Sequence, residues 1–562
     1  QAFPVEQDPE QIVVGAPRRI KDWSGQGLGF LVQLAPRDLY ERMDGHQLSE
    51  ALRRSTRFIL TTIHKAKQDH VDALWNELNG SDQLELAIVR RKILDHIRFY
   101  LPQLGAHSEQ PLKDKLNRLK EAHSRLTEAD ERKEGQSACD KARNTYDKRC
   151  KELAACLDTD SEAHRIVLAQ LRRKLAEFQY EADGVLFELF QNADDAAVEL
   201  GRCEALGAEI EIPEAARRFV LQAGSSHVRA LHWGRLINYR GPHNLPDRWS
   251  GFGDDLEKML ILSASDKPDD ETVTGRFGLG FKSVFLVCDK PRIVSGDLQV
   301  EICGGILPKL WSDAGRAIAL LNKHAQDRLY RGTLIELSVD HGKLADVVGR
   351  FASYAGLVAV FSRALRSVHL DMKDGNRPID WLPLKPVEGV EVGETNMPGT
   401  PSQLSRLLVL RAKNGAVAIK LGAHGCEVIE SEVVPVWVTV PTRESDQIGF
   451  VINGAFQLDA GRGRLAGNQS GNVLMMREIG REIGERLYCL LQTHEDPNAW
   501  TSRRMELGLV MDCTPAQFLA SVWQTLCKRT LAGAESSDLQ KLAGELVTAA
   551  FVGWCERGGP IP

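Results

Sequence analysis

Short runs with strand character alternate with helical segments and glycine-rich loops between residues 208 and 339. These runs are Ala208 to Ile212, Val228 to His232, Arg292 to Val294, Leu298 to Ile302 and Thr333 to Leu337. Such alternation is typical of an α/β layer, in which helices cover a sheet. We therefore expect a two-layer α/β domain over residues 161–345.

Strand signals return between residues 351 and 458, which predicts a second α/β domain over residues 346–480. They are Ser367 to Met372, Leu407 to Arg411, Ala416 to Leu421, Val433 to Val440 and Gly449 to Ile452. Because 562 residues exceed the usual size of one domain, further units are expected. We expect a mostly helical N-terminal region over residues 1–107, a charged helical arm over 108–160, and a helical C-terminal region over 481–562.

Composition excludes several classes of protein. The 71 Lys and Arg and 77 Asp and Glu give a net charge of −6, and 43% of residues are hydrophobic, as in ordinary globular proteins. Interspersed charges in the arm favour one or two solvated helices or a short coiled coil over a nucleic-acid surface. We expect no membrane-spanning helix, because no stretch approaches the ~20 apolar residues that are needed to cross a bilayer. Eleven scattered cysteines without a C-x-x-C pair favour a reducing, cytoplasmic location. The start at Gln1 suggests a part of a longer polypeptide.

The segment from Asp183 to Ala196 predicts an amphipathic helix with a polar face. Glu188, Asn192 and Asp195 follow one another at i, i+4 and i+7 and so share that face. Amide and carboxylate oxygens suit Mg²⁺, and a carboxylate one turn earlier can orient and deprotonate water. The alternative is an ordinary solvated helix face.

A glycine-rich segment, Gly275 to Gly280, lets the backbone approach an anion closely, and the apolar residues after it predict a helix whose N–H groups face that anion. The segment lacks the G-K-[ST] ending of a P-loop and the preceding strand of a Rossmann fingerprint. A third element, the Gly332-Thr333 pair, opens a predicted strand.

In this order and spacing, the three elements resemble the ATP-binding domain of the gyrase, heat-shock chaperone, histidine kinase and MutL superfamily, which has the Bergerat fold. The run Leu189 to Ala196 and the run Gly275 to Phe285 are similar to the sacsin-type N-terminal ATPase-like domain in particular. The resemblance covers residues 161–345 and extends loosely to residues 449–465, a strand and basic loop of the next domain.

The resemblance implies a role for each matching residue. Glu188 would be the general base, Asn192 the Mg²⁺ ligand and Asp195 a support on the adenine or ribose side. Arg462 or Arg464 would reach the γ-phosphate from the second domain as a catalytic residue. The remaining residues implied to bind nucleotide are His232, Gly234, Gly275, Phe277, Gly278, Leu279, Gly280, Phe281 and Thr333.

One position departs from the superfamily pattern. His232 stands where the superfamily reads adenine with an Asp, and Trp233 follows in place of a small polar residue. Neutral His offers one donor and one acceptor, whereas a carboxylate only accepts, so adenine selectivity is open. Trp233 could fill the base pocket, and His232 could be a core histidine at a strand end.

These features predict Mg²⁺-dependent ATP binding and slow hydrolysis that drive a conformational switch, as in a chaperone. Two alternatives stay open. One is a degenerate nucleotide-sensing scaffold. The other is a DNA-associated ATPase that is similar to MutL-like or microrchidia-like proteins and could belong to a bacterial defence system, although the overall charge does not indicate DNA. The resemblance alone makes a homodimer an expectation, and no membrane partner is expected. The client protein is not predicted.

Overall fold

The computed structural model describes most of the chain from residue 110 onward. The described ranges are 110–132, 136–159, 161–177, 180–204, 216–237, 255–260, 280–296, 298–325, 332–372, 375–458, 463–466, 470–492, 497–530 and 537–560. The N-terminal region 1–107, the predicted strand Ala208 to Ile212, residues Gly275 to Leu279 of the glycine-rich segment, and Arg462 lie outside the described residues.

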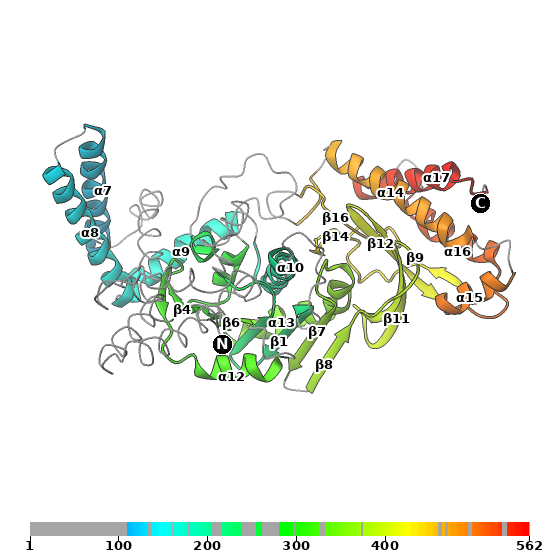
Figure 1. Ribbon diagram of the computed structural model, residues 1–562, viewed down its shortest axis with the longest axis horizontal. Coiled ribbons are helices and arrows are strands. Elements are labelled where there is room, and N and C mark those ends of the chain that lie inside the picture. The colour runs from blue at the N-terminus through cyan, green and yellow to red at the C-terminus, as the bar shows by residue number, and fades with distance from the viewer. Residues whose placement is uncertain are drawn as a thin grey trace, which may run out of the picture.

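The predicted charged arm is a pair of packed helices. Helices α7 (Gln110–Glu131) and α8 (Gln136–Thr159) lie side by side, with Leu119, Tyr146 and Leu153 among their buried side chains. Helix α9 (Ser161–Glu177) follows and leads into the body of the molecule (Figure 1). The arm lies at one end of the molecule and the C-terminal helices at the other, with the two sheets between them.

Among the described residues, the first sheet contains eight strands and is largely antiparallel. The strands are β1 (Arg218–Ala223), β2 (His227–His232), β3 (Arg292–Ser295), β4 (Leu298–Cys303), β5 (Leu307–Leu310), β6 (Thr333–Ser338), β7 (Ser367–Met372) and β8 (Gly375–Asp380). Their order is β5-β4-β3-β6-β2-β1-β7-β8, and only β1 and β7 pair in parallel among these described strands. The predicted strands at residues 228, 292, 298, 333 and 367 are confirmed.

The two faces of this sheet bury different side chains because successive residues of a strand point to opposite sides. Phe219 and Leu221 face the main core, where α10 (Val185–Glu204), α13 (His341–Phe361) and the short 3₁₀ helix η6 (Phe281–Leu286) pack. Val220 faces the opposite side, under α12 (Gly315–His324). Two small elements flank the main-core helices, η3 (Ala182–Gly184) before α10 and α11 (Asp255–Leu260).

The second sheet is covered by the C-terminal helices. Its strands are β9 (Leu384–Val387), β10 (Val390–Met397), β11 (Thr400–Ala412), β12 (Gly415–Gly422), β13 (Gly425–Glu427), β14 (Val436–Val438), β15 (Val440–Pro441) and β16 (Val451–Gly454). The helices are α14 (Ser470–Leu491), α15 (Pro497–Leu507), α16 (Pro515–Cys527) and α17 (Asp538–Glu556). Helix α14 approaches α17 closely: a Cβ added at Gly484 would lie 1.9 Å from the carbonyl oxygen of Ala550, so only glycine fits. Helix α14 also continues across residue 480, where the sequence suggested a domain boundary.

Helix α13 is shared by the two sheets. It contacts β7 and β8 of the first sheet and β10 of the second, and one continuous apolar core includes Phe351 of α13, Phe219 of the first sheet and Val409 of the second. By length and composition, the segment Gly342–Phe361 is apolar enough to cross a membrane. The expectation that the sequence contains no such stretch is therefore wrong. The most apolar stretch of this segment is 61% buried between the sheets, as in the core helix of a folded domain. The protein is thus a mixed α/β structure with two mixed sheets.

Candidate functional site

A cavity of about 310 Å³ lies where α10 faces the end of β2 and the start of β6. Helix α11 and the residues that open η6 complete its walls. Seven of the residues singled out in the sequence line it: Glu188, Asn192, Asp195, His232, Gly280, Phe281 and Thr333. Segments that are distant in the chain therefore bring the predicted polar groups to one place.

Helix α10 supplies one wall of the cavity. Leu186, Leu189 and Phe190 fill the main core, which turns Glu188 and Asn192 toward the cavity. Glu188 is partly buried and Asn192 is exposed. A Cβ added at Gly280 would lie 2.6 Å from Oε2 of Glu188, so this carboxylate lies directly against the backbone at the end of the glycine-rich segment.

The two adjacent aspartates of α10 have different surroundings. Asp194 is fully buried, and its carboxylate accepts hydrogen bonds from the backbone N–H groups of Arg363, Ala364 and Leu365 at 3.0, 2.8 and 3.0 Å. Asp195 lines the cavity and forms an ion pair with the guanidinium of Arg363. The sequence analysis did not identify Asp194, which anchors α10 to the segment after α13. The ion pair competes with the ribose contact expected of Asp195.

The ends of β2 and β6 form the opposite wall. His232 pairs with Thr333 in the strand register, and the buried hydroxyl of Thr333 is 2.7 Å from the Oγ of Ser295. Gly234 is not among the cavity-lining residues; a Cβ there would lie 2.6 Å from the backbone of Ala196, so its contribution is the close packing of this loop on α10.

His232 is buried and neutral at physiological pH. The backbone N–H of Gly234 donates to its Nδ1 at 3.3 Å. Burial, and secondly the positive charge of Arg235, lower the pKa of His232 to about 4. The ring therefore contributes a neutral imidazole to the cavity wall.

Trp233 faces away from the cavity. Its buried indole packs with Leu321 of α12 and with Trp311 on the other face of the first sheet. The reading in which Trp233 fills the pocket is therefore wrong. Alternation along an extended chain explains the difference, because His232 and Trp233 are neighbours and point to opposite sides.

A charged cluster that the sequence analysis missed closes the cavity beyond His232. Arg235 is largely buried, and its guanidinium donates to Glu199 at 2.7 Å and to both carboxylate oxygens of Asp255 at 2.7 and 3.0 Å. Burial alone would lower the pKa of Arg235, but Asp255 and Glu199 raise it. Glu199, Arg235 and Asp255 all line the cavity. The sequence signal was an Arg next to Gly234 at a strand end, but its partners are too distant in the chain to be identified from spacing.

The glycine-rich segment is described only from Gly280. After it, the predicted helix is the six-residue 3₁₀ helix η6, and the hydroxyl of Ser283 donates to the carbonyl of Gly280 at 2.7 Å. Lys282 is fully buried, and its Nζ lies 3.5 Å from the carbonyl oxygen of Lys258. Because this 3₁₀ helix has only six residues, fewer backbone N–H groups can face an anion at its start than at the start of a long helix.

Of the two arginines predicted to reach the site from the second domain, Arg462 lies outside the described residues and Arg464, which is exposed, does not line the cavity. Arg443, which the sequence analysis did not identify, forms ion pairs with Glu181 and Asp183 just before α10. Its backbone N–H donates to the carbonyl of Gly463, so the basic loop lies beside it. Arg350 of α13 also pairs with Asp183.

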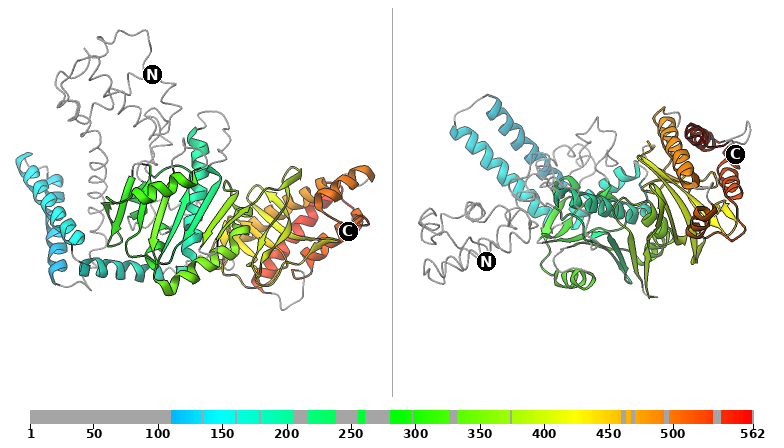
Figure 2. Two further views of the ribbon diagram at one scale, coloured as in Figure 1. Left: turned by 90° about the horizontal axis from the view of Figure 1, so that it is seen from below. Right: turned by 45° about the vertical axis from the view of Figure 1, so that its right-hand side comes forward.

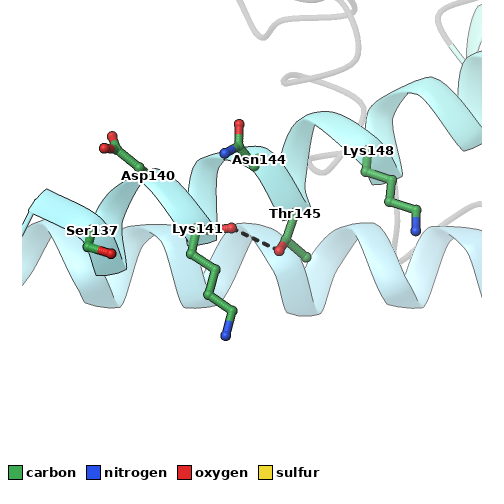
Figure 3. A pocket seen from close by; sticks show the side chains of 6 residues that line it. All are labelled: Ser137, Asp140, Lys141, Asn144, Thr145 and Lys148. Atoms are coloured by element: carbon green, nitrogen blue, oxygen red, sulfur yellow. Dashed lines mark hydrogen bonds between the residues drawn. The ribbon is translucent and has the colours of Figure 1, made fainter.

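A shallow hollow on the arm is a weaker candidate site. Six polar residues of α8 line it: Ser137, Asp140, Lys141, Asn144, Thr145 and Lys148. Asp140 and Asn144 point to one side of the helix and Lys141 to the other, and the Thr145 hydroxyl is bonded to the Lys141 carbonyl (Figure 3). Because these side chains diverge, they do not form a binding site.

Metal binding at the main cavity depends on few protein ligands. Within the described residues, no group of three His, Cys, Asp or Glu side chains is placed to hold an ion. Mg²⁺ is commonly held by one or two protein oxygens together with phosphate oxygens and water, so the amide oxygen of Asn192 fits as such a minimal protein ligand. No protein-family model matches this chain, and the search of curated proteins gives no match.

Proposed function

We propose that this protein binds a nucleoside triphosphate with Mg²⁺ in the cavity beside α10 and hydrolyses it slowly. ATP is the nucleotide that the resemblance implies, and a Bergerat-type domain of the sacsin-like branch is the corresponding fold. The observation that carries the proposal is the position of the Glu188 carboxylate against the Gly280 backbone, in a cavity that Asn192, His232 and Thr333 also line.

In the proposed reaction, Glu188 is the general base. Its Oε2 would accept a proton from the water that attacks the terminal phosphate, and the neighbouring Gly280 lets phosphate oxygens approach the backbone. Asn192 Oδ1 would hold Mg²⁺, which supplies positive charge to the phosphates when it is bound. His232 and Thr333 would contact the base end.

The contacts before α10 support a nucleotide-driven conformational switch. Asp183 lies five positions before Glu188 and pairs with Arg443 of the second-sheet region and Arg350 of α13. A small displacement of α10 on nucleotide binding or phosphate release would therefore change ion pairs to the second sheet. A scaffold that only senses nucleotide would need this connection but would have no need of a base at position 188.

The proposal is tested by calorimetry with Mg²⁺ and nucleotide, together with phosphate release, on the wild type and Glu188→Gln. We expect both proteins to bind and the variant to release phosphate roughly 10²- to 10⁴-fold more slowly, because a general base is removed. Glu177→Gln, an exposed carboxylate of α9, is the matched control and should behave as the wild type. Binding without release in the wild type would indicate a nucleotide-sensing scaffold. Absence of binding at protein concentrations that detect a millimolar Kd would overturn the proposal.

A further inference from the structure

The tautomer of His232 is fixed by its surroundings. Nδ1 accepts a hydrogen bond from the backbone N–H of Gly234, so Nδ1 carries no proton. Because burial and the nearby Arg235 lower the pKa of the ring to about 4, the imidazole is neutral at pH 7 and its one proton resides on Nε2. His232 lines the cavity, and it therefore presents a hydrogen-bond donor there.

His232 lies away from the reacting end of the proposed site. Gly234 packs on the backbone of Ala196, eight residues beyond Glu188 on α10. At 1.5 Å per residue, the two positions are about 12 Å apart along the helix. This distance leaves room for the phosphates near Glu188 and the ribose between, and places the base beside His232.

Purine bases differ in what they present at the six-position. Guanine and hypoxanthine carry an oxygen there, which accepts a hydrogen bond, whereas adenine carries an amino group, which donates. A donor at Nε2 satisfies the oxygen and opposes the amino group. From this geometry we infer that His232 makes the cavity select 6-oxopurine nucleotides over adenine nucleotides, an inference that rests on the proposed function and names its substrate class.

The same end of the cavity holds acceptors for the other side of such a base. A 6-oxopurine has an N–H at ring position one, next to its oxygen. Glu199 and Asp255 are carboxylates on the cavity wall, and Arg235 balances one of their two negative charges. The His232 donor can pair with the oxygen at position six of a 6-oxopurine, and a carboxylate beside it can accept from the N–H at position one. In adenine, position six donates and position one accepts, so both pairs are mismatched.

The inference is tested by calorimetric titration of the wild type with the Mg²⁺ complexes of GTP, ITP and ATP. We expect GTP and ITP to bind about tenfold more tightly than ATP, which is the effect of one mismatched buried hydrogen bond. His232→Asp replaces the donor with an acceptor and should reverse the ranking. His424→Asp, an exposed histidine of the second-sheet region, is the control and should keep the wild-type ranking.

The outcomes separate the inference from the proposed function. Tighter binding of ATP than of GTP and ITP by the wild type would overturn the selectivity and leave nucleotide hydrolysis standing. No binding of any of the three would remove the proposed function and the inference with it. If circular dichroism shows that His232→Asp does not fold, the order in which the wild type binds GTP, ITP and ATP is by itself the test of the inference.

Discussion

The two sheets handle their buried polar groups differently. In the second sheet, the buried carboxylate of Glu391 accepts from Arg411 at 2.7 Å and from the indole of Trp381 at 3.0 Å, and Arg411 also donates to the carbonyl of Val360. In the first sheet, the buried imidazole of His232 accepts from the Gly234 backbone, and the residue lines a cavity.

This difference indicates which sheet carries the site. A buried polar group with its partners inside the protein stabilises one arrangement of the core, whereas a polar group directed into a cavity keeps hydrogen-bonding capacity for a ligand. In the second sheet these contacts fix β10 and β11 to α13, whereas in the first sheet His232 lines the candidate cavity, although Glu336 there is paired with Arg229 and Arg292. A substitution at Glu391 in the second sheet should therefore mainly lower stability, whereas a substitution in the cavity wall of the first sheet should mainly change ligand binding.

The largest expected effect follows from Glu391→Ala. Removing the carboxylate leaves the partly buried Arg411 without its charge partner and the buried indole of Trp381 without an acceptor, so we expect the free energy of unfolding to fall by about 3 kcal/mol. Urea unfolding measures it. Nucleotide binding should persist in the folded fraction, since this pair does not line the cavity.

Glu394→Ala provides the control for this prediction. Glu394 lies on the same strand and pairs with Arg406, but the two side chains are 46% and 36% exposed, so the expected loss is below about 1 kcal/mol. Equal losses for the two variants would show that the buried pair has no special role in the second sheet.

An intermediate effect is expected from His232→Gln, and it depends on pH. The folded state keeps His232 neutral down to about pH 4, whereas an unfolded chain protonates it near pH 6.5. Protons therefore favour the unfolded state between these values, and the free energy of unfolding falls as pH drops from 6.5 toward 4. The variant should lack this part of the fall, which reaches about 3 kcal/mol at pH 4.

Urea unfolding of both proteins at pH 7 and pH 4.5 measures this difference. His424→Gln, at an exposed position, should follow the wild type at both pH values. A parallel fall in wild type and His232→Gln would mean that other groups account for the acid sensitivity, and that His232 is not held neutral.

The sequence predicted much of the fold because its signals are local. Strands such as Leu298 to Ile302 and Ser367 to Met372 alternate apolar and polar residues, and the structure confirms them. It missed β1, although Phe219, Val220 and Leu221 are all apolar, because a run buried on both faces has no alternation to detect. The apolar residues after Gly280 predicted a helix but not its type, and the structure has the six-residue 3₁₀ helix η6 there.

For the candidate site, sequence spacing identified the polar face of α10 but could not identify its partners. Glu188 and Asn192 share a face by helical period, which needs no tertiary information. The Arg235 cluster joins residues 199, 235 and 255, and the anchor at Asp194 bonds to backbone groups near residue 364. Such contacts depend on the chain path between elements. The resemblance pointed to Arg462 or Arg464 of the basic loop, and spacing alone could not identify Arg443, whose ion pairs with Glu181 and Asp183 connect this region to the start of α10.

The smallest expected effect on stability concerns the connection between the two sheets. Arg443→Ala removes the ion pairs to Glu181 and Asp183, but Arg443 is 34% exposed, so the free energy of unfolding should change by less than about 1 kcal/mol. If these pairs link the second sheet to α10, phosphate release should slow by up to about fivefold, which corresponds to the same energy.

Parallel measurements of urea unfolding and phosphate release separate the two effects of Arg443→Ala. Arg477→Ala is the matched control, because its exposed pair with Glu545 joins α14 to α17 and does not touch α10. A rate loss in Arg443→Ala alone would mean that the second sheet acts on the site through the start of α10. Equal rates in both variants would mean that the first sheet works independently, and that the two sheets share a core but not a function.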